Sequence, residues 1–254
     1  MTRVLSDTYQ LTLRALRETA RQPALEITNI FIPMFFFAVT VGAIGNVAGR
    51  AFGVTNYTGF QMPVAVLQAV AGAAGAAGIG TVTDIERGYF DKLMLTPTPR
   101  ISLVLGRLAA DGVRVMILTT LIVVVGLIAG SGMASGPIGM IMLIAMGGAF
   151  GIAYSGIGMA FALKTGSAQA AQIGFLIFFP LIFLSPAFAP KEFFAPWLEF
   201  LATINPVTYI IEGQRDLVLR GWDLGSLAAA FGSIAGLGIF TMTLTLLALR
   251  SRTA

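Results

Sequence analysis

The chain has 254 residues, of which 56% are hydrophobic and only 11% are charged, and its mean hydropathy is +0.85. A water-soluble domain carries roughly 25% charged residues, so this composition excludes an ordinary soluble protein and predicts a polytopic membrane protein. The formal net charge is +4 and the chain has no cysteine or histidine, which excludes disulfides, thiolate chemistry and histidine-based metal sites, and we expect no bound metal.

Residues 1–22 predict an amphipathic helix rather than a signal peptide, because no short apolar core with a small-residue cleavage site follows the start. Polar and apolar residues recur at spacings of four and three, which places them on opposite helical faces. The polar face contains Arg3, Asp7, Gln10, Arg14, Arg17 and Arg21, and the apolar face contains Leu5, Tyr9, Leu13, Leu16 and Ala20. We expect an interfacial helix on the cytoplasmic side with its arginines toward lipid headgroups. A solvated helix packed on another protein domain is the alternative.

Six apolar segments predict six membrane-spanning helices. They cover residues 27–47, 60–82, 108–130, 138–163, 170–187 and 227–249. The fourth is long enough to be tilted, and residues 188–225 form neither a clean span nor a polar loop. Because no extramembrane stretch is long enough for a separate soluble domain, we expect one all-α transmembrane domain over residues 1–254.

Lysine and arginine are unequally divided between the two sides of this arrangement. Eleven lie in the N-terminal segment, the loop between the second and third spans, the loop after the fourth span and the C-terminal tail, against four on the other side. Cytoplasmic loops carry the excess of basic residues. We therefore expect a multi-pass protein of the plasma (inner) membrane with both termini in the cytoplasm.

The loop between the second and third spans reads DIERGYFDKLMLTPTPR over residues 84–100. Its first half can form a short helix that presents Phe90, Leu93 and Met94 along one apolar edge. The two Thr-Pro pairs then favour an extended chain, because each proline disfavours the α conformation of its predecessor. The segment suits docking onto a cytoplasmic partner, although an ordinary polar loop fits the residues equally well.

Charged and small residues mark two of the spans. Arg107, Asp111 and Arg114 are spaced by four and three near the cytoplasmic end of the third span. On one helical face, Arg107 and Arg114 can therefore both pair with the Asp111 carboxylate, one from each side. We expect these residues to form a structural charge network within reach of the 84–100 loop. The second span carries a row of glycines at Gly72, Gly75, Gly78 and Gly80. Such a row favours close helix packing, with a pathway-lining helix as the alternative.

Two longer stretches carry ordered motifs. In ERGYFDKLMLTPTPR the residues that fit a known loop pattern are Glu86, Arg87, Gly88, Leu93, Thr96, Pro97 and Arg100. The second stretch, residues 183–215, reads FLSPAFAPKEFFAPWLEFLATINPVTYIIEGQR. Both resemble type-2 ABC exporter permeases of the daunorubicin-resistance-like family, with Pro186 in place of the usual glycine and Val207 in place of the usual leucine. The resemblance extends over the whole chain, since the amphipathic start, six spans, loop and hairpin follow in the family's order.

The resemblance implies a cytoplasmic coupling helix within residues 84–100 that docks on a separate ABC ATPase subunit. It also implies a second permease half, identical or similar, and surrounding membrane lipids, with no nucleic-acid partner. The implied coupling contacts are Glu86, Arg87, Phe90, Leu93, Pro97 and Arg100. The chain contains no Gly-x-x-x-x-Gly-Lys-Ser/Thr motif. We therefore expect a transport subunit that is not itself an enzyme and binds no cofactor, with ATP and Mg held by the partner ATPase.

The resemblance also implies a re-entrant helical hairpin on the external side, over residues 188–225. In this hairpin Asn205 and Pro206 are typical of a helix cap and a first helical residue. A helix from 206 toward 218 would place Glu212 and Arg215 one turn apart. Such a helix would close the exit path, or it would lie on the outer surface.

The expected substrate is a hydrophobic drug, antibiotic or lipid, because few charges lie along the spans to hold a polar solute. The candidate pathway residues are Phe36, Phe178 and Phe179. A polysaccharide or teichoic-acid exporter permease is the first alternative. An ion-coupled secondary transporter is disfavoured because Asp111 alone is a candidate carboxylate within the spans. An intramembrane enzyme is disfavoured because the chain lacks catalytic histidine, cysteine and serine motifs.

Overall fold

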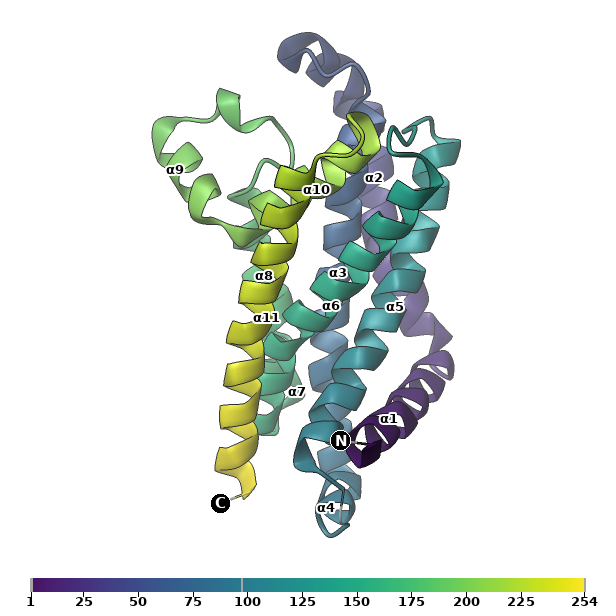
Figure 1. The fold of residues 1–254 in the computed structure, drawn as a ribbon, viewed down its shortest axis with the longest axis vertical. Helices are drawn as coiled ribbons and strands as arrows, with labels where there is room; N and C mark the ends of the chain where they lie inside the picture. The colour runs from purple at the N-terminus through teal and green to yellow at the C-terminus, as the bar shows by residue number, and fades with distance from the viewer. Residues whose placement is uncertain (1, 97, 254) are drawn as a thin grey trace.

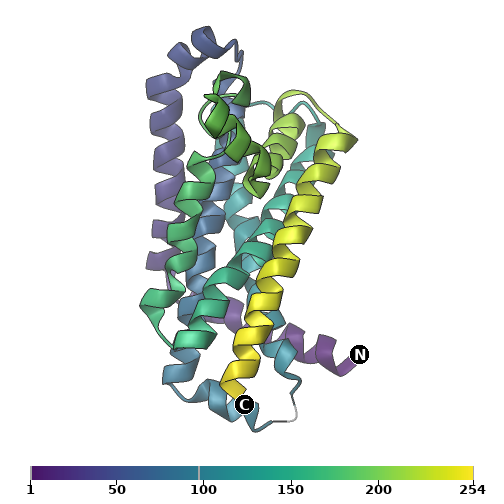
Figure 2. The ribbon, with the colours of Figure 1, turned by 90° about the vertical axis from the view of Figure 1, so that its left-hand side faces the viewer.

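The computed structural model describes residues 2–96 and 98–253, and the chain there is helical with short connections. The elements are α1 Thr2–Ala20, α2 Pro23–Phe52, α3 Tyr57–Glu86, α4 Tyr89–Met94, α5 Arg100–Ile128, α6 Gly136–Thr165, α7 Ala168–Ala171, α8 Ile173–Phe183, the 3-10 turn Lys191–Phe193, α9 Pro196–Ile204, α10 Pro206–Leu219 and α11 Leu224–Thr253. The long helices lie side by side in an elongated bundle (Figure 1). Both termini and α4 lie at one end of it, whereas α9 and α10 lie at the other, as Figures 1 and 2 both show.

Five helical stretches are long and apolar enough to cross a membrane. They are Glu26–Phe52, Tyr57–Glu86, Arg100–Ile128, Gly136–Thr165 and Leu224–Arg252. Four of them contain the first, second, fourth and last predicted spans and extend beyond both predicted ends. The third predicted span, 108–130, overlaps Arg100–Ile128, which begins earlier and ends two residues sooner.

The predicted fifth span, residues 170–187, is built differently. It consists of α7 and α8, which are separated at Gln172, and the combined apolar stretch Ala168–Phe183 is shorter than the five candidate spans. Pro180 lies inside α8 without ending it. Together α7 and α8 run from the end that carries α4 back toward α9 (Figures 1 and 2).

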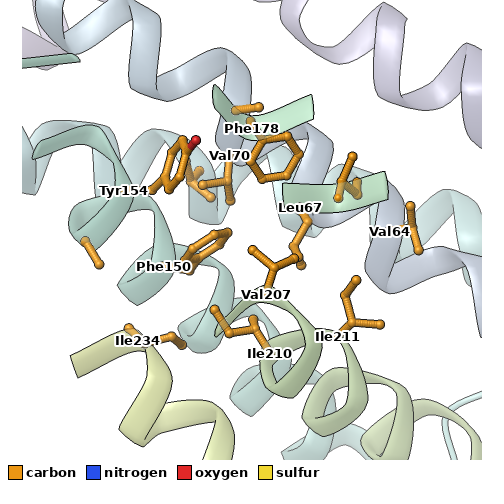
Figure 3. Packing of buried hydrophobic residues seen from close by; sticks show 14 of the residues in the cluster. Val64, Leu67, Val70, Phe150, Tyr154, Phe178, Val207, Ile210, Ile211 and Ile234 are labelled. Atoms are coloured by element: carbon orange, nitrogen blue, oxygen red, sulfur yellow. The ribbon is translucent and has the colours of Figure 1, made fainter. Parts of the chain in front are cut away.

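Helix α3 forms the centre of the bundle and packs against α2, α5, α6 and α10. Its side chains are apolar around most of the circumference, which is the pattern of a buried helix. One cluster joins Val64, Leu67 and Val70 of α3 to residues of α6, α8 and α10 (Figure 3). Close packing also needs small residues, since a Cβ at Gly78 would lie 2.7 Å from the Gly158 carbonyl oxygen of α6.

Helix α1 lies across α5 rather than parallel to the bundle axis (Figure 1). The two backbones nearly touch, because a Cβ at Gly106 would lie 2.6 Å from Leu11 Cβ, and Thr12 Oγ1 donates a hydrogen bond to the Gly106 carbonyl at 3.1 Å. Two apolar side chains of α1, Leu5 and Tyr9, are left uncovered and are 70% and 60% exposed. Pro23 starts α2, a position that proline favours.

The turn before α4 reverses the chain at the end of α3. Gly88 has a φ of 64°, a left-handed conformation that glycine adopts without strain. The short helix expected in this loop therefore begins at Tyr89, whereas Asp84 and Glu86 still belong to α3. Pro99 is extended, with φ −58° and ψ 126°, and α5 begins at the next residue.

Candidate functional site

The segment around α4 forms the tip of the bundle at the end that carries both termini (Figure 1). Of the predicted coupling residues, Glu86, Arg87 and Arg100 are exposed and Leu93 is half-buried. Pro97 lies outside the described residues. The exposed side chains form a mixed polar surface on both sides of α4.

Phe90 occupies a different position from the other predicted coupling residues, since only 6% of it is exposed. Its ring is enclosed by residues of three long helices, which are Val104, Leu108, Met159, Leu163, Ala248 and Leu249. The guanidinium of Arg252 in α11 lies 5.9 Å from the ring centre and also donates a hydrogen bond to the Leu163 carbonyl at 3.2 Å. In this structure Phe90 therefore anchors α4 to α5, α6 and α11 and does not face outward.

Leu95 is the large apolar side chain that α4 leaves uncovered. It directly follows the helix and is 89% exposed. The sequence analysis missed it, because the apolar edge of the predicted helix ended at Met94. A large apolar side chain at the tip of a charged turn is typical of a contact made with a partner.

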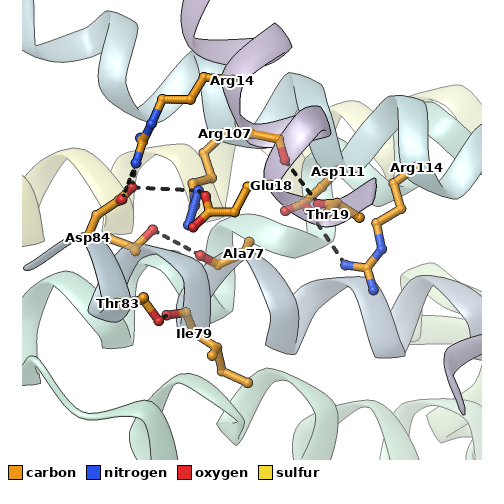
Figure 4. A network of polar contacts seen from close by, with 12 residues as sticks. Arg14, Glu18, Thr19, Ala77, Ile79, Thr83, Asp84, Arg107, Asp111 and Arg114 are labelled. Carbon is orange, nitrogen blue, oxygen red and sulfur yellow. Dashed lines mark hydrogen bonds and ion pairs between the residues drawn. The ribbon is translucent and has the colours of Figure 1, made fainter. Parts of the chain in front are cut away.

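A network of ion pairs lies directly above α4 and joins α1, α3 and α5 (Figure 4). Arg14 of α1 donates hydrogen bonds to both carboxylate oxygens of Asp84, at 2.6 and 3.2 Å. Its guanidinium also lies 3.6 Å from the centre of the Tyr89 ring. Burial alone would lower the pKa of Arg14, but the hydrogen bond and charge of Asp84 raise it above the ordinary value. The polar face of α1 is therefore not directed wholly toward headgroups, as the sequence had suggested, because Arg14 turns into the bundle.

Arg107 extends the network along α5. Its Nη1 lies 3.2 Å from Glu18 Oε2 and 3.6 Å from Asp84 Oδ2. The guanidinium crosses α3 directly over Gly80, where any Cβ would collide with it. The absence of a side chain at Gly80 thus lets Arg107 reach partners on two other helices.

Arg114 and Asp111 form the deeper part of the network, within α5. Arg114 Nε donates a 2.7 Å hydrogen bond to Glu26 of α2, and Arg114 Nη1 lies 4.0 Å from Asp111 Oδ1. The expected satisfaction of Asp111 from both sides is not found among the described residues, because Arg107 pairs with Glu18 and Asp84 instead. Long arginine side chains reach acceptors on neighbouring helices, which spacing along a single helix does not reveal.

At the other end of the bundle, Arg215 joins α10 to two neighbours. Its Nε donates to the Phe60 carbonyl at 3.1 Å and its Nη2 to the Pro186 carbonyl at 2.9 Å. The guanidinium also lies over the Phe60 ring, 3.4 Å from its centre. Burial lowers the pKa of Arg215 to about 9. Such a desolvated cation needs the carbonyl oxygens and the ring that surround it.

The remaining hairpin residues stabilise the start and side of α10. Asn205 Oδ1 accepts from the Val207 N–H at 3.0 Å, its Nδ2 donates to the Leu181 carbonyl at 2.6 Å, and Pro206 is the first helical residue. The cap expected at these two residues is therefore present. Glu212 pairs with Lys191 of the 3-10 turn at 3.4 Å.

The three predicted pathway phenylalanines lie in different surroundings. Phe178 is buried within the chain and meets Tyr154 edge-on, with ring centres 5.5 Å apart (Figure 3). Phe36 and Phe179 are 48% and 43% exposed on the outer faces of α2 and α8. In this structure Phe178 is a core residue, and only the other two are available to a substrate, a lipid or a second subunit.

The fold is an apolar helical bundle with a charged helical tip at one end and a short helical hairpin at the other. Its long apolar helices are those of an integral membrane protein. A family model described as ABC-2 type transporter matches residues 6–219. The chain therefore belongs to the ABC-2 type transporter family and is an ABC transporter permease.

Several curated proteins are similar to the chain along most of its length. The daunorubicin resistance ABC transporter permease protein DrrB1 of Streptomyces coeruleorubidus is 24% identical over 240 residues, which cover 91% of this chain and 83% of that protein. The probable doxorubicin resistance ABC transporter permease protein DrrC of Mycobacterium tuberculosis is 25% identical over 219 residues, which cover 85% of this chain and 78% of that protein. The putative transport permease ycf38 of Porphyra purpurea is 26% identical over 216 residues, which cover 84% of this chain and 74% of that protein.

Proposed function

We propose that this chain is the membrane-spanning subunit of an ATP-driven exporter, and that a separate ABC ATPase binds the tip formed by residues 84–100. The observation that carries the proposal is the family assignment combined with the exposed tip around α4. ABC-2 permeases associate with an ABC ATPase, and this chain has no nucleotide-binding motif of its own. ATP and Mg are accordingly bound by the partner.

In this proposal the chain crosses the plasma membrane six times, with α7 and α8 as the fifth crossing. Both termini and α4 face the cytoplasm, and residues 188–225 form the external re-entrant hairpin. The excess of basic residues at the α4 end supports this orientation. The exposed apolar face of α1, which includes Leu5 and Tyr9, then contacts the acyl boundary of the inner leaflet.

The contacts of α4 support a route by which movement of the ATPase reaches the membrane helices. Phe90 ties α4 to α5, α6 and α11, and Arg14 ties the end of α3 to α1. When the ATPase displaces α4, these contacts require α3, α5, α6 and α11 to move with it, and α1 to follow α3. A central path between two permease halves is thereby opened alternately to the two sides.

The proposed substrates are hydrophobic drugs, antibiotics or lipids. The names of the relatives DrrB1 and DrrC, which refer to daunorubicin and doxorubicin resistance, support this class. The outer faces of α2 and α8, with Phe36 and Phe179 exposed, are apolar surfaces of the kind that a second permease half or a hydrophobic substrate contacts.

Co-purification with the ABC ATPase tests the proposal. Leu95→Asp places a charge on the 89% exposed apolar residue of the tip, and Leu224→Asp does the same to an 80% exposed leucine at the opposite end. We expect the unchanged chain and the Leu224 variant to retain the ATPase and the Leu95 variant to lose most of it. Equal retention by both variants would show that the ATPase binds elsewhere, and absence of any ATPase in all three preparations would refute the proposal.

A further inference from the structure

Helix α1 has three sides that lie in different surroundings. One side faces α5, where Thr12 Oγ1 donates a hydrogen bond to the Gly106 carbonyl at 3.1 Å. A second side carries Leu5 and Tyr9, which are one turn apart and are 70% and 60% exposed. A third side is basic. Its members are all exposed and recur at spacings of seven and four, which keeps them on one edge of the helix and of the turn that follows it; they are Arg3, Gln10, Arg17 and Arg21.

The positive charge of this basic edge is not neutralised within the chain. The other arginine of the segment, Arg14, turns into the bundle and pairs with Asp84 (Figure 4). Of the two carboxylates in residues 2–22, Glu18 pairs with Arg107, which leaves Asp7. Within residues 2–96 and 98–253 no ion pair is formed by the three arginines of the edge. Three outward guanidiniums therefore stand against one carboxylate.

The contacts of α1 place it at the level where the apolar spans begin. It meets α5 at Gly106, just before the apolar run that starts at Leu108. It meets α3 at Asp84, just after the apolar run that ends at Val82. The candidate span of α2 starts at Glu26, shortly after α1 ends at Ala20. Because α1 also lies across the bundle (Figure 1), it runs along the plane of the membrane surface.

We propose that α1 binds anionic phospholipid in the leaflet at the α4 end of the bundle. Leu5 and Tyr9 lie at the boundary of the acyl chains, a depth that tyrosine favours. The guanidiniums of the basic edge lie among the headgroups, where each one favours a net negative lipid over a zwitterionic one. Arg14 of the same helix holds Asp84 and lies on the Tyr89 ring, so the bound lipid fixes the helix that steadies the tip.

A fluorescent reporter on the basic edge can measure which lipid lies beside it. The chain has no cysteine, so Gln10→Cys provides a single labelling site between Arg3 and Arg17. The labelled permease is placed in phosphatidylcholine nanodiscs that contain an equal fraction of either phosphatidylglycerol or phosphatidylcholine brominated at the top of the acyl chains. Bromine quenches a fluorophore on contact. We expect the brominated phosphatidylglycerol to quench several-fold more strongly than the brominated phosphatidylcholine.

A matched pair of double variants tests the role of the arginines. Arg17→Gln combined with Arg21→Gln should lower the preference for phosphatidylglycerol about fivefold or more, since one arginine near an anionic surface contributes about fivefold in affinity. Arg50→Gln combined with Arg220→Gln removes the same charge from exposed arginines at the opposite end and should leave the preference unchanged.

Salt provides a second measurement that needs no substitution of an arginine. Raising the ionic strength from about 0.1 M to about 1 M shortens the Debye length from about 10 Å to about 3 Å. The preference of the reporter for phosphatidylglycerol should then largely disappear. Equal quenching by the two lipids at low salt, or a preference that persists in the Arg17 and Arg21 variant, would overturn the proposal.

The lipid contact is measured on the permease alone, which separates this inference from the exporter proposal. Equal quenching in a chain that retains its ATPase would refute the lipid site and leave the exporter proposal standing. Preferential quenching in a chain that retains no ATPase would support the lipid site and refute the exporter. Loss of the ATPase from the Arg17 and Arg21 variant, with no quenching by either lipid, would show that the ATPase covers this edge and would also refute the lipid site.

Discussion

Arg14 of α1 and Asp84 of α3 are 70 positions apart in the chain and are joined by two hydrogen bonds of 2.6 and 3.2 Å. The same guanidinium lies on the ring of Tyr89, the first residue of α4. One side chain therefore connects the N-terminal helix, the last turn of α3 and the start of the tip. This connection makes α1 part of the unit that a bound ATPase would move.

Disrupting this pair should affect coupling more than stability. Arg14 is 36% exposed at its side chain and Asp84 is 11% exposed, so Asp84→Asn should cost only about 1 kcal/mol in the free energy of unfolding. We expect ATPase binding to persist while ATP-dependent transport falls several-fold. Full activity of Asp84→Asn in reconstituted vesicles would show that α1 plays no part in coupling.

Gly80→Ala should disturb the network although it adds a single methyl group. The added Cβ collides with the Arg107 guanidinium, and Arg107 must leave Asp84 or Glu18. Because the guanidinium is the flexible end of its side chain and keeps one of its two partners, loss of the other contact should lower the free energy of unfolding by about 1 kcal/mol. Gly75→Ala is the matched control, because its Cβ meets open space. Thermal unfolding of the two variants side by side measures the effect, and equal midpoints would contradict the assigned position of Arg107.

Phe90→Ala should detach the tip from the bundle. The ring fills a buried cluster shared by α5, α6 and α11, and its removal should cost about 3–5 kcal/mol. We expect faster proteolysis within residues 84–100 and reduced ATPase co-purification, although Phe90 itself is not exposed. Phe193→Ala, at a 56% exposed phenylalanine near the other end, should do neither. Protection from proteolysis equal to that of the unchanged chain would rule out the anchoring role.

Arg215→Lys should be damaging despite the retained charge. Lysine cannot donate in the same fork to the Phe60 and Pro186 carbonyls or lie flat on the Phe60 ring. A buried carbonyl left without a donor costs about 1–3 kcal/mol, so we expect a clear fall in the unfolding midpoint. Arg220→Lys changes an arginine whose side chain is 82% exposed and should be neutral. Equal midpoints for both variants would contradict the role of Arg215 in holding the hairpin.

The sequence predicted those features that depend on local patterns. Hydrophobic runs located the five long helices, and the Asn205-Pro206 pair located the start of α10 to the residue. Each of these follows from chemistry within a few neighbouring positions. The turn at Gly88 was less clear, since a glycine in a charged loop does not by itself reveal where α3 ends.

Features that depend on neighbouring helices could not be read from the sequence. Phe178 and Phe179 are adjacent and chemically identical, yet one is 2% exposed and the other 43%. Apolar side chains in a membrane protein face lipid as readily as protein, so composition does not separate the two cases. The partners of Arg14, Arg107 and Arg114 were missed for the same reason, because the carboxylates lie on α1, α2 and α3.

The absence of cysteine from the chain allows the most direct test of the central claim, that the tip around α4 is where an ATPase binds in the cytoplasm. A single cysteine at Leu95, with one at Leu224 for comparison, can be fitted with a photo-crosslinker in cells that also produce the ABC ATPase. We predict an adduct between permease and ATPase from position 95 and none from position 224. Labelling of position 95 by a membrane-impermeant maleimide added to intact cells, together with an ATPase adduct formed only from position 224, would contradict the account.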